Sequence, residues 1–244
     1  DSLRKQVAGQ ENEIAAIIIE PARGQEAPKG YLESLKNLSR EFGAVLIFDE
    51  ITSGFRMCAG GIHRIYNVYP DMAVFAKGMS NGYAMSAILG TEKVMQSAQK
   101  TFISSTNWTE KIGPVAALAT LEKYQKESVD KKIICSGKKV KSIWEKASKK
   151  YGLEITISGL PSLCSFSFNY PNQNILNTLF TTKMLEMGIL GFRQFKPSLA
   201  HSDKDIKLYE KAVDYIFQDL AKNIDSPNYN YPLQHQGFKR LTKE

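Results

Sequence analysis

Three short apolar runs, each closed by a charged residue, constrain the fold of this 244-residue chain more than any other feature. They occupy residues 14–19, 44–48 and 72–76, and the residues that close them are Glu20, Asp49 and Lys77. Unbroken apolar runs of this length, bounded by turn signals, are typical of strands that are buried on both faces. The sequence therefore predicts three such strands.

An amphipathic helix separates the first two runs. Leu32, Leu35, Leu38 and Phe42 recur at helical spacing and form one apolar stripe. A strand, a helix and a second strand in this order indicate a parallel sheet. The run "SAILG" at residues 86–90 predicts a further strand after a turn. We therefore expect an α/β fold with a mainly parallel sheet and flanking helices.

The polar residues that close the runs share one edge of the predicted sheet. Glu20, Asp49 and Lys77 each follow the carboxyl end of a strand. Ligands of open α/β sheets bind outside the carboxyl ends of the strands. The three side chains are therefore expected to converge on one crevice.

A lysine at the end of a buried strand can act as a nucleophile. Burial favours the neutral amine, which can form an imine with a carbonyl group. Pyridoxal 5'-phosphate (PLP) is often held in this way, and its pyridine nitrogen needs a carboxylate that keeps it protonated. Lys77 and Asp49 suit these two roles. The alternative to a catalytic role is a purely structural one, in which Lys77 extends into solvent from the strand end and Asp49 caps the next helix.

Three stretches in this order resemble the class III, fold type I, PLP-dependent aminotransferases, the group that includes glutamate-1-semialdehyde aminomutase. They are "AAIIIEP", "VLIFDEITSGFR" and "PDMAVFAKGMSNGYAMSAILG". The stretch "GPVAALATL" resembles a helix of the same family, and "GILG…PSLAHSDKDI" resembles the closing segment of its aminomutase-like branch. The resemblance covers roughly residues 1–220. It implies part of a PLP-binding large domain, PLP as cofactor, and a homodimer with shared active sites.

The resemblance assigns roles to particular residues. Lys77 matches the lysine that forms the imine with the cofactor and later moves a proton between the substrate carbon and the cofactor. Asp49 matches the aspartate that pairs with the pyridine nitrogen, and Ile51 matches the apolar residue against one face of the ring.

The family also uses a threonine that reaches across the dimer interface to the phosphate of the partner's cofactor. A gapless alignment puts Thr109 at that position, within "ISSTNWTEKIGP". Glu110, Lys111 and Gly113 replace the family's usual residues there, so Ser105 and Thr106 stay open as alternatives. In the structural alternative, Thr109 only caps the next helix.

Two further acids match acidic positions of the family. Glu20 and Glu50 are second candidates for the site, and either can instead brace a loop or neutralise a nearby arginine such as Arg56. His201 is interpreted as structural, because it precedes Ser202, which together with Asp205 predicts a helix N-cap. His63 and His235 have no partner that the sequence identifies.

The second half of the chain mixes strands and helices. A helix at residues 112–127 is expected to pack on the first sheet. Beyond it, helices are expected around Trp144, at 175–187 and at 203–224, with strands at 153–157 and 163–168. This mixture predicts a small α+β domain. The predicted division is residues 1–125 for part of the large domain, 126–225 for the small domain and 226–244 for an extended tail.

Composition argues against several other classes of protein. The net charge is +7, but the lysines alternate with acidic residues and form no basic stripe with aromatics, so nucleic-acid binding is not expected. Cys58, Cys135 and Cys164 form no CxxC pair, so neither disulfides nor a metal site are expected, and a cytoplasmic location is favoured. No apolar stretch approaches the ~20 residues that span a bilayer, so no membrane association is expected.

Three functional interpretations stay open at this stage. The first is a transaminase that acts on a small-molecule amino donor and a carbonyl acceptor, such as an amino acid, an amino aldehyde or a related compound. The second is glutamate-1-semialdehyde 2,1-aminomutase, although residues 79–83 depart from the glycine-rich turn of that enzyme. The third is a cofactor-free interaction protein. The opening "DSLRKQVAGQ" resembles the middle of a helix and its exit, so we expect a fragment of a longer enzyme rather than a degenerate relative.

Overall fold

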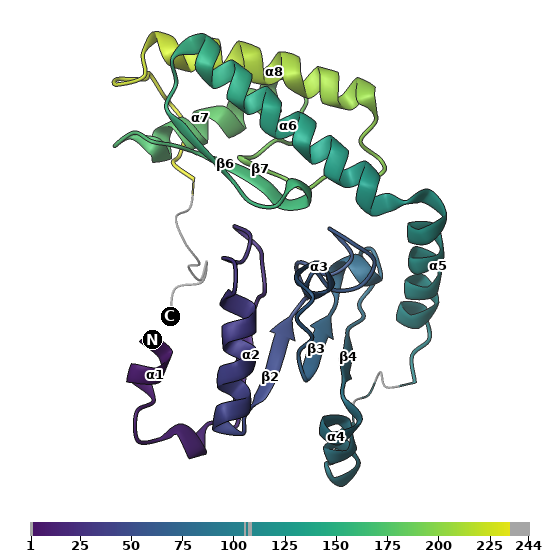
Figure 1. Ribbon diagram of the computed structural model, residues 1–244. Helices are drawn as coiled ribbons and strands as arrows, with labels where there is room; N and C mark the ends of the chain where they lie inside the picture. Colours follow the sequence, from purple (N-terminus) through teal and green to yellow (C-terminus); the bar gives the residue numbers. More distant parts are fainter. Residues whose placement is uncertain (1, 105, 107–108, 235–244) are drawn as a thin grey trace. The chain divides into compact units, whose positions relative to one another are not determined.

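The computed structural model describes residues 2–104, 106 and 109–234 (Figure 1). The chain divides into two compact units, Asp1–Lys132 and Ile133–Glu244. The predicted boundary at residue 125 and the predicted tail from residue 226 stay predictions.

The first unit contains a four-stranded sheet in the order β1-β2-β3-β4. The strands span Ala16–Ile19 (β1), Val45–Asp49 (β2), Met72–Phe75 (β3) and Ala87–Gly90 (β4). Strands β1, β2 and β3 are parallel, whereas β4 runs antiparallel to β3. The predicted α/β fold with a mainly parallel sheet is confirmed.

The two faces of this sheet differ in burial. Leu46 and Phe48 of β2 are fully buried on one face. The opposite face carries Ile18, Ile47 and Ile88, and the exposed fractions of Ile18 and Ile88 are 68% and 53%. The prediction that the strands are buried on both faces is therefore wrong. An unbroken apolar run shows that both faces are apolar, but it does not show what covers each face.

Helices cover the buried face of the sheet. The helices of the first unit are α1 (Ser2–Gln6), α2 (Tyr31–Phe42), α3 (His63–Tyr66), α4 (Glu92–Met95) and α5 (Ile112–Glu127). Short 3-10 turns are η1 (Glu11–Glu13), η2 (Lys77–Met79) and η3 (Gln96–Lys100). All four residues of the predicted α2 stripe are buried, and α2 lies along β2 (Figure 1). On α5, Ala117 packs with Phe75 of β3.

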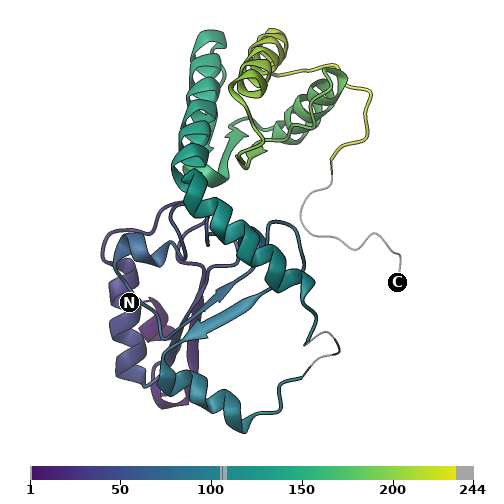
Figure 2. The same cartoon turned by 90° about the vertical axis from the view of Figure 1, so that its right-hand side faces the viewer.

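The second unit joins an antiparallel sheet to three helices (Figure 2). The strands β5 (Ile155–Ser158), β6 (Cys164–Phe168) and β7 (Gln194–Phe195) pair in that order. The helices are α6 (Val129–Tyr151), α7 (Gln173–Glu186) and α8 (Asp203–Lys222), and a 3-10 turn, η4 (Pro161–Leu163), precedes β6. The predicted elements are present, and the short strand β7 was not predicted.

An aromatic cluster fills the core of the second unit. The ring of Phe166 lies 5.0 Å from that of Trp144, 5.1 Å from Phe180 and 5.7 Å from Phe217, measured between centroids. The indole N–H of Trp144 donates to the hydroxyl of Tyr209 at 2.9 Å and ties α6 to α8. The polar atoms of Trp144 and Tyr209 therefore have hydrogen-bond partners inside the core.

The predicted cap of the last helix is present. Ser202 and Asp205 form a capping box at the start of α8, with the Ser202 side chain accepting from the Asp205 backbone N–H. The Nδ1 atom of His201 accepts from the Ser198 backbone N–H at 3.1 Å, which agrees with the structural role expected of this histidine.

Candidate active site

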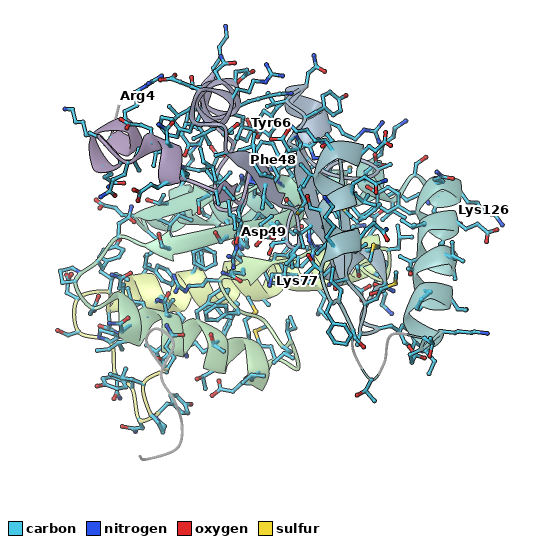
Figure 3. The ribbon with its side chains drawn as sticks, turned by 90° about the horizontal axis from the view of Figure 1, so that it is seen from below. Arg4, Phe48, Asp49, Tyr66, Lys77 and Lys126 are labelled. Atoms are coloured by element: carbon cyan, nitrogen blue, oxygen red, sulfur yellow. The ribbon has the colours of Figure 1, made fainter. Side chains whose placement is uncertain are left out.

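Asp49 and Lys77 lie at the carboxyl edge of two neighbouring parallel strands, β2 and β3 (Figure 3). The register pairs Asp49 of β2 with Val74 of β3, and the backbone N–H of Glu50 donates to the Val74 carbonyl at 2.9 Å. Lys77 lies three residues beyond Val74, at the start of η2. The two residues therefore lie at the same edge of the sheet, as the sequence predicts.

Asp49 is half-buried and ends the less covered face of the sheet. Its Oδ1 atom accepts a hydrogen bond from the backbone N–H of Ile51 at 2.9 Å. The second carboxylate oxygen, Oδ2, has no hydrogen-bond partner among the described residues. Asp49 thus shapes the turn that follows β2 and keeps one acceptor oxygen open.

Lys77 has an unusual backbone and an exposed side chain. Its φ of 47° lies in the left-handed region, which costs free energy for a residue other than glycine. The Nζ atom donates to the hydroxyl oxygen of Thr52 at 2.9 Å. The sequence argument supposed a buried amine, but the described residues leave the Lys77 side chain exposed. Strand β3 ends at Phe75, so Lys77 belongs to the turn and not to the buried strand.

A single turn at residues 49–52 links these side chains. Asp49 binds the backbone of Ile51, and the next residue, Thr52, accepts from Lys77. Ile51 is half-buried in the same turn. The structure thus brings Asp49, Ile51 and Lys77 together, and it adds Thr52, which sequence analysis missed.

Glu50, the residue after Asp49, is fully buried. Its carboxylate accepts from Ser53 Oγ at 2.6 Å and from the backbone N–H groups of Ile62 and His63, both at 3.0 Å. It also contacts Nδ1 of His63 at 2.9 Å. Burial by itself raises the pKa of the Glu50 carboxyl, but the hydrogen bonds from His63, Ser53 and the backbone outweigh it and hold that pKa below its usual range.

The suggested pairing of Glu50 with Arg56 is wrong, because both oxygens of the Glu50 carboxylate already accept hydrogen bonds from Ser53, Ile62 and His63. Arg56 instead donates through Nε to the carbonyl of Thr52 at 2.8 Å, and burial lowers the pKa of its guanidinium. The partner of Glu50, His63, lies 13 residues away in the sequence. No local pattern signals that pair. Glu50 acts as the brace of a loop.

Two glycines allow this loop to close. A Cβ at Gly54 would lie 2.7 Å from the carbonyl oxygen of Glu50 and 2.8 Å from Cδ1 of Phe75. At Gly61, a Cβ would lie 2.7 Å from the Glu50 carboxylate and 2.3 Å from Nδ1 of His63. All four distances are too short for a Cβ contact, so the loop from residue 50 to residue 63 requires glycine at these two positions.

Glu20 forms an exposed ion pair at the end of β1. Its carboxylate accepts from Arg23 at 3.0 Å. Both residues line an open hollow of about 460 Å³ that residues 19–28 and Tyr31 surround. No hydrogen bond or ion pair joins Glu20 to Asp49 or Lys77 among the residues that the structure describes. Asp49 and Lys77 share one edge of the sheet, and the expected convergence of all three charged residues on one crevice stays a prediction.

The threonine region lies before α5. Thr109 is exposed, as is Thr106, and Ser105 lies outside the described residues. The carboxylate of Glu110, not the hydroxyl of Thr109, accepts from the backbone N–H groups of Ile112 and Gly113 at the start of α5. The choice among the three candidates stays a prediction.

A metal centre and a membrane-spanning helix are two further features that residues 2–104, 106 and 109–234 could hold. Within these ranges, no group of three or more His, Cys, Asp or Glu side chains gathers as a metal site would require. None of the described helices combines the length and the hydropathy that a bilayer crossing demands.

Comparisons with known proteins agree on one family. The family model for class III aminotransferases matches residues 1–214. The chain is 31% identical over 234 residues to 3-aminobutyryl-CoA aminotransferase of Cloacimonas acidaminovorans, with 91% of this chain and 56% of that protein covered. It is 28% identical over 229 residues to glutamate-1-semialdehyde 2,1-aminomutase of Methanosarcina acetivorans, with 86% and 53% covered.

Solved structures share the fold. The internal aldimine form, with PLP, of the FumI protein of Sphingopyxis sp. MTA144 superposes with a TM-score of 0.86 at 23% identity, covering 93% of this chain and 57% of that one. A transaminase with PLP bound gives 0.82 at 20% identity, with 91% and 55% covered. The chain spans about half the length of the curated relatives it matches. The resemblance drawn from the sequence motifs is confirmed, and the chain belongs to the class III aminotransferase family.

Proposed function

We propose that this protein carries out PLP-dependent amino-group transfer through Lys77. The observation that carries the proposal is the turn at residues 49–52, which binds the Asp49 carboxylate on one side and the Lys77 amine on the other. The substrates are a small-molecule amino donor and a carbonyl acceptor. The relatives are named for different substrates, so the proposed substrates are amino acids, amino aldehydes and related carbonyl compounds.

The described residues fit PLP in two respects. The Oδ2 atom of Asp49 is an open acceptor for the pyridine N–H, while Oδ1 is held by the backbone of Ile51. The Lys77 amine is exposed, and among the described residues its hydrogen bond goes to the hydroxyl of Thr52 and not to a carboxylate. A lysine amine and a partner for the pyridine nitrogen are two of the groups by which proteins hold this cofactor.

When bound, PLP supplies an electron sink for negative charge that develops on the substrate carbon. Lys77 would tether the cofactor through Nζ and would hold or move a proton at that atom. Asp49 would keep a proton on the pyridine nitrogen, and Ile51 would lie against one face of the ring. Thr109 is assigned to the phosphate.

The test is covalent trapping at Lys77. The purified protein is mixed with PLP, reduced with borohydride and digested, and mass spectrometry locates the pyridoxyl group. We expect the label on Lys77, and we expect Lys77→Ala to lose the label and to lower amino transfer by about 10²–10⁴-fold. The control is Lys126→Ala, which removes an exposed lysine at the end of α5 and leaves the label in place.

Two outcomes contradict the proposal. If Lys77→Ala keeps both PLP and transfer activity, Lys77 takes no part in the reaction. A protein that binds no PLP, and instead binds a polyanion in a salt-dependent way, would favour the cofactor-free interaction protein.

The second candidate function is glutamate-1-semialdehyde 2,1-aminomutase. It is supported by two relatives of that name, at 28% and 30% identity. An aminomutase converts its substrate without a separate acceptor. Incubation with glutamate-1-semialdehyde alone therefore distinguishes the two functions, because a transaminase needs an added carbonyl compound to turn over.

Further aspects of the whole protein belong to the same proposal. It is a homodimer with shared active sites, in which Thr109 of one subunit serves the cofactor of the other, and it works in the cytoplasm. The large-domain part ends at residue 125, the small domain ends at residue 225, and a tail follows. Light scattering on the purified protein measures the subunit number.

A further inference from the structure

Thr52 is the one described side chain that forms a hydrogen bond with the Lys77 amine. The Nζ to Oγ1 distance is 2.9 Å, although the two residues are 25 positions apart in the sequence. Thr52 belongs to the turn that follows β2, and Lys77 belongs to the turn that follows β3. The contact therefore joins two neighbouring turns at the carboxyl edge of the sheet.

The backbone around Thr52 is held in place from several sides. Its carbonyl accepts from Arg56 Nε at 2.8 Å. Asp49, at the start of the turn, accepts from the Ile51 backbone N–H. Ser53, the residue after Thr52, donates to the buried carboxylate of Glu50. A hydroxyl on so constrained a backbone has few positions available to it. Thr52 is a fixed acceptor and not a mobile surface group.

The backbone of Lys77 is constrained as well. Its left-handed conformation determines the direction in which the side chain leaves the chain. Gly78, the next residue, lies so close to the first turn that a Cβ there would be 3.3 Å from the carbonyl oxygen of Gly54. The two turns therefore pack against each other, and the distance between Thr52 and Lys77 follows from that packing.

A hydroxyl is a suitable partner for an amine that changes its proton count. It accepts a hydrogen bond from an ammonium ion, and it donates one to a neutral amine. A carboxylate at the same place would favour the ammonium ion alone. A lysine side chain also has many rotamers, so one fixed contact selects the rotamers that keep Nζ at the carboxyl edge.

We propose that Thr52 is a positioning residue for Lys77, because its hydroxyl holds the amine at the carboxyl edge of the sheet in both protonation states. This inference rests on the proposed function of Lys77. Thr52 acts through the lysine and requires no contact with substrate.

The test uses three variants of the purified protein. Thr52→Val removes the hydroxyl and keeps the shape, and Thr52→Ser keeps the hydroxyl. Thr120→Val is the matched control, because Thr120 is a half-buried threonine of the same unit whose hydroxyl donates to the Ala116 carbonyl at 2.7 Å. Each variant is compared with the unmodified protein in two measurements.

The first measurement is independent of activity. Without PLP, the rate of reductive methylation at Lys77 is followed by mass spectrometry at fixed pH. We expect Thr52→Val to raise this rate about threefold, because the Lys77 amine loses the hydrogen bond that holds it and becomes more accessible to the reagent. Thr52→Ser and Thr120→Val are expected to match the unmodified protein.

The second measurement separates kcat from KM with an amino donor that the protein accepts. We expect Thr52→Val to lower kcat about threefold to tenfold and to change KM by less than about twofold, with Thr52→Ser restoring kcat. Equal methylation rates in Thr52→Val and Thr120→Val would overturn the inference. So would a loss of kcat that Thr52→Ser does not restore.

These outcomes separate the inference from the proposed function. If Lys77→Ala keeps PLP and activity, the proposed function fails, and the positioning role fails with it whatever the methylation rates are. If Lys77→Ala is inactive while the Thr52 variants all behave alike, only the positioning role fails.

Discussion

The second unit is organised around an apolar core, and the carboxyl edge of the first unit is organised around polar contacts. In the second unit, Trp144, Phe166 and Phe217 are at most 1% exposed and pack ring against ring. In the first unit, Ile18 and Ile88 leave one face of the sheet largely exposed. Stability and site geometry therefore depend on different interactions in the two units.

The polar contacts of the first unit concentrate where the proposed chemistry occurs. The buried Glu50 carboxylate orders the loop that leaves β2, and Asp49 and Thr52 order the turn that meets Lys77. Hydrogen bonds are directional, whereas apolar packing is not, so polar contacts hold the lysine more exactly in place than an apolar core would.

The largest effect is expected in the aromatic core. Phe166→Ala should lower the free energy of unfolding by about 3–5 kcal/mol, because the ring is 1% exposed and its removal leaves a cavity among four other aromatic rings. Urea denaturation of the purified protein measures the change. The matched control is Phe192→Ala, whose ring is 40% exposed and whose loss should cost less than about 1 kcal/mol. Similar losses in both variants would show that the second unit has no dominant core.

A smaller effect, dependent on pH, is expected at Glu50. Glu50→Gln should cost about 1–3 kcal/mol at neutral pH, because buried donors lose a charged acceptor. The pKa of Glu50 is lowered in the folded protein, so its stabilisation is fully present above the pKa of the unfolded chain. That stabilisation is lost as the pH falls through the folded-state pKa.

The difference between the unmodified protein and Glu50→Gln should therefore shrink as the pH falls below about 4.5. Urea denaturation from pH 7 to pH 3 measures this trend, with the exposed Glu122→Gln as control. A difference that stays constant over the whole pH range would contradict the role assigned to the charged carboxylate.

The smallest effect is expected on the exposed face of the sheet. Ile18→Ala should change the free energy of unfolding by about 0.5 kcal/mol or less, because Ile18 is 68% exposed. Leu46→Ala, on the covered face of the adjacent strand, should cost about 2–5 kcal/mol. Equal costs would mean that another surface covers Ile18 in solution, and the contrast between the two units would then fail.

Local patterns account for what was predicted correctly. The stripe from Leu32 to Phe42 and the cap at Ser202 depend on residues three or four positions apart, and a helix brings such residues together wherever it lies. Asp49 and Lys77 were found because each follows an apolar run, and runs of this kind end at a common edge of a parallel sheet.

The sequence by itself determined the family, the α/β fold with its mainly parallel sheet, and the position of an aspartate and a lysine at one edge of that sheet. Only the tertiary structure decided that Glu50 meets His63, that Thr52 meets Lys77 and that one sheet face stays exposed. These contacts join residues 13 and 25 positions apart. They depend on strand register and on the packing of two turns, and no periodicity in the sequence carries that information.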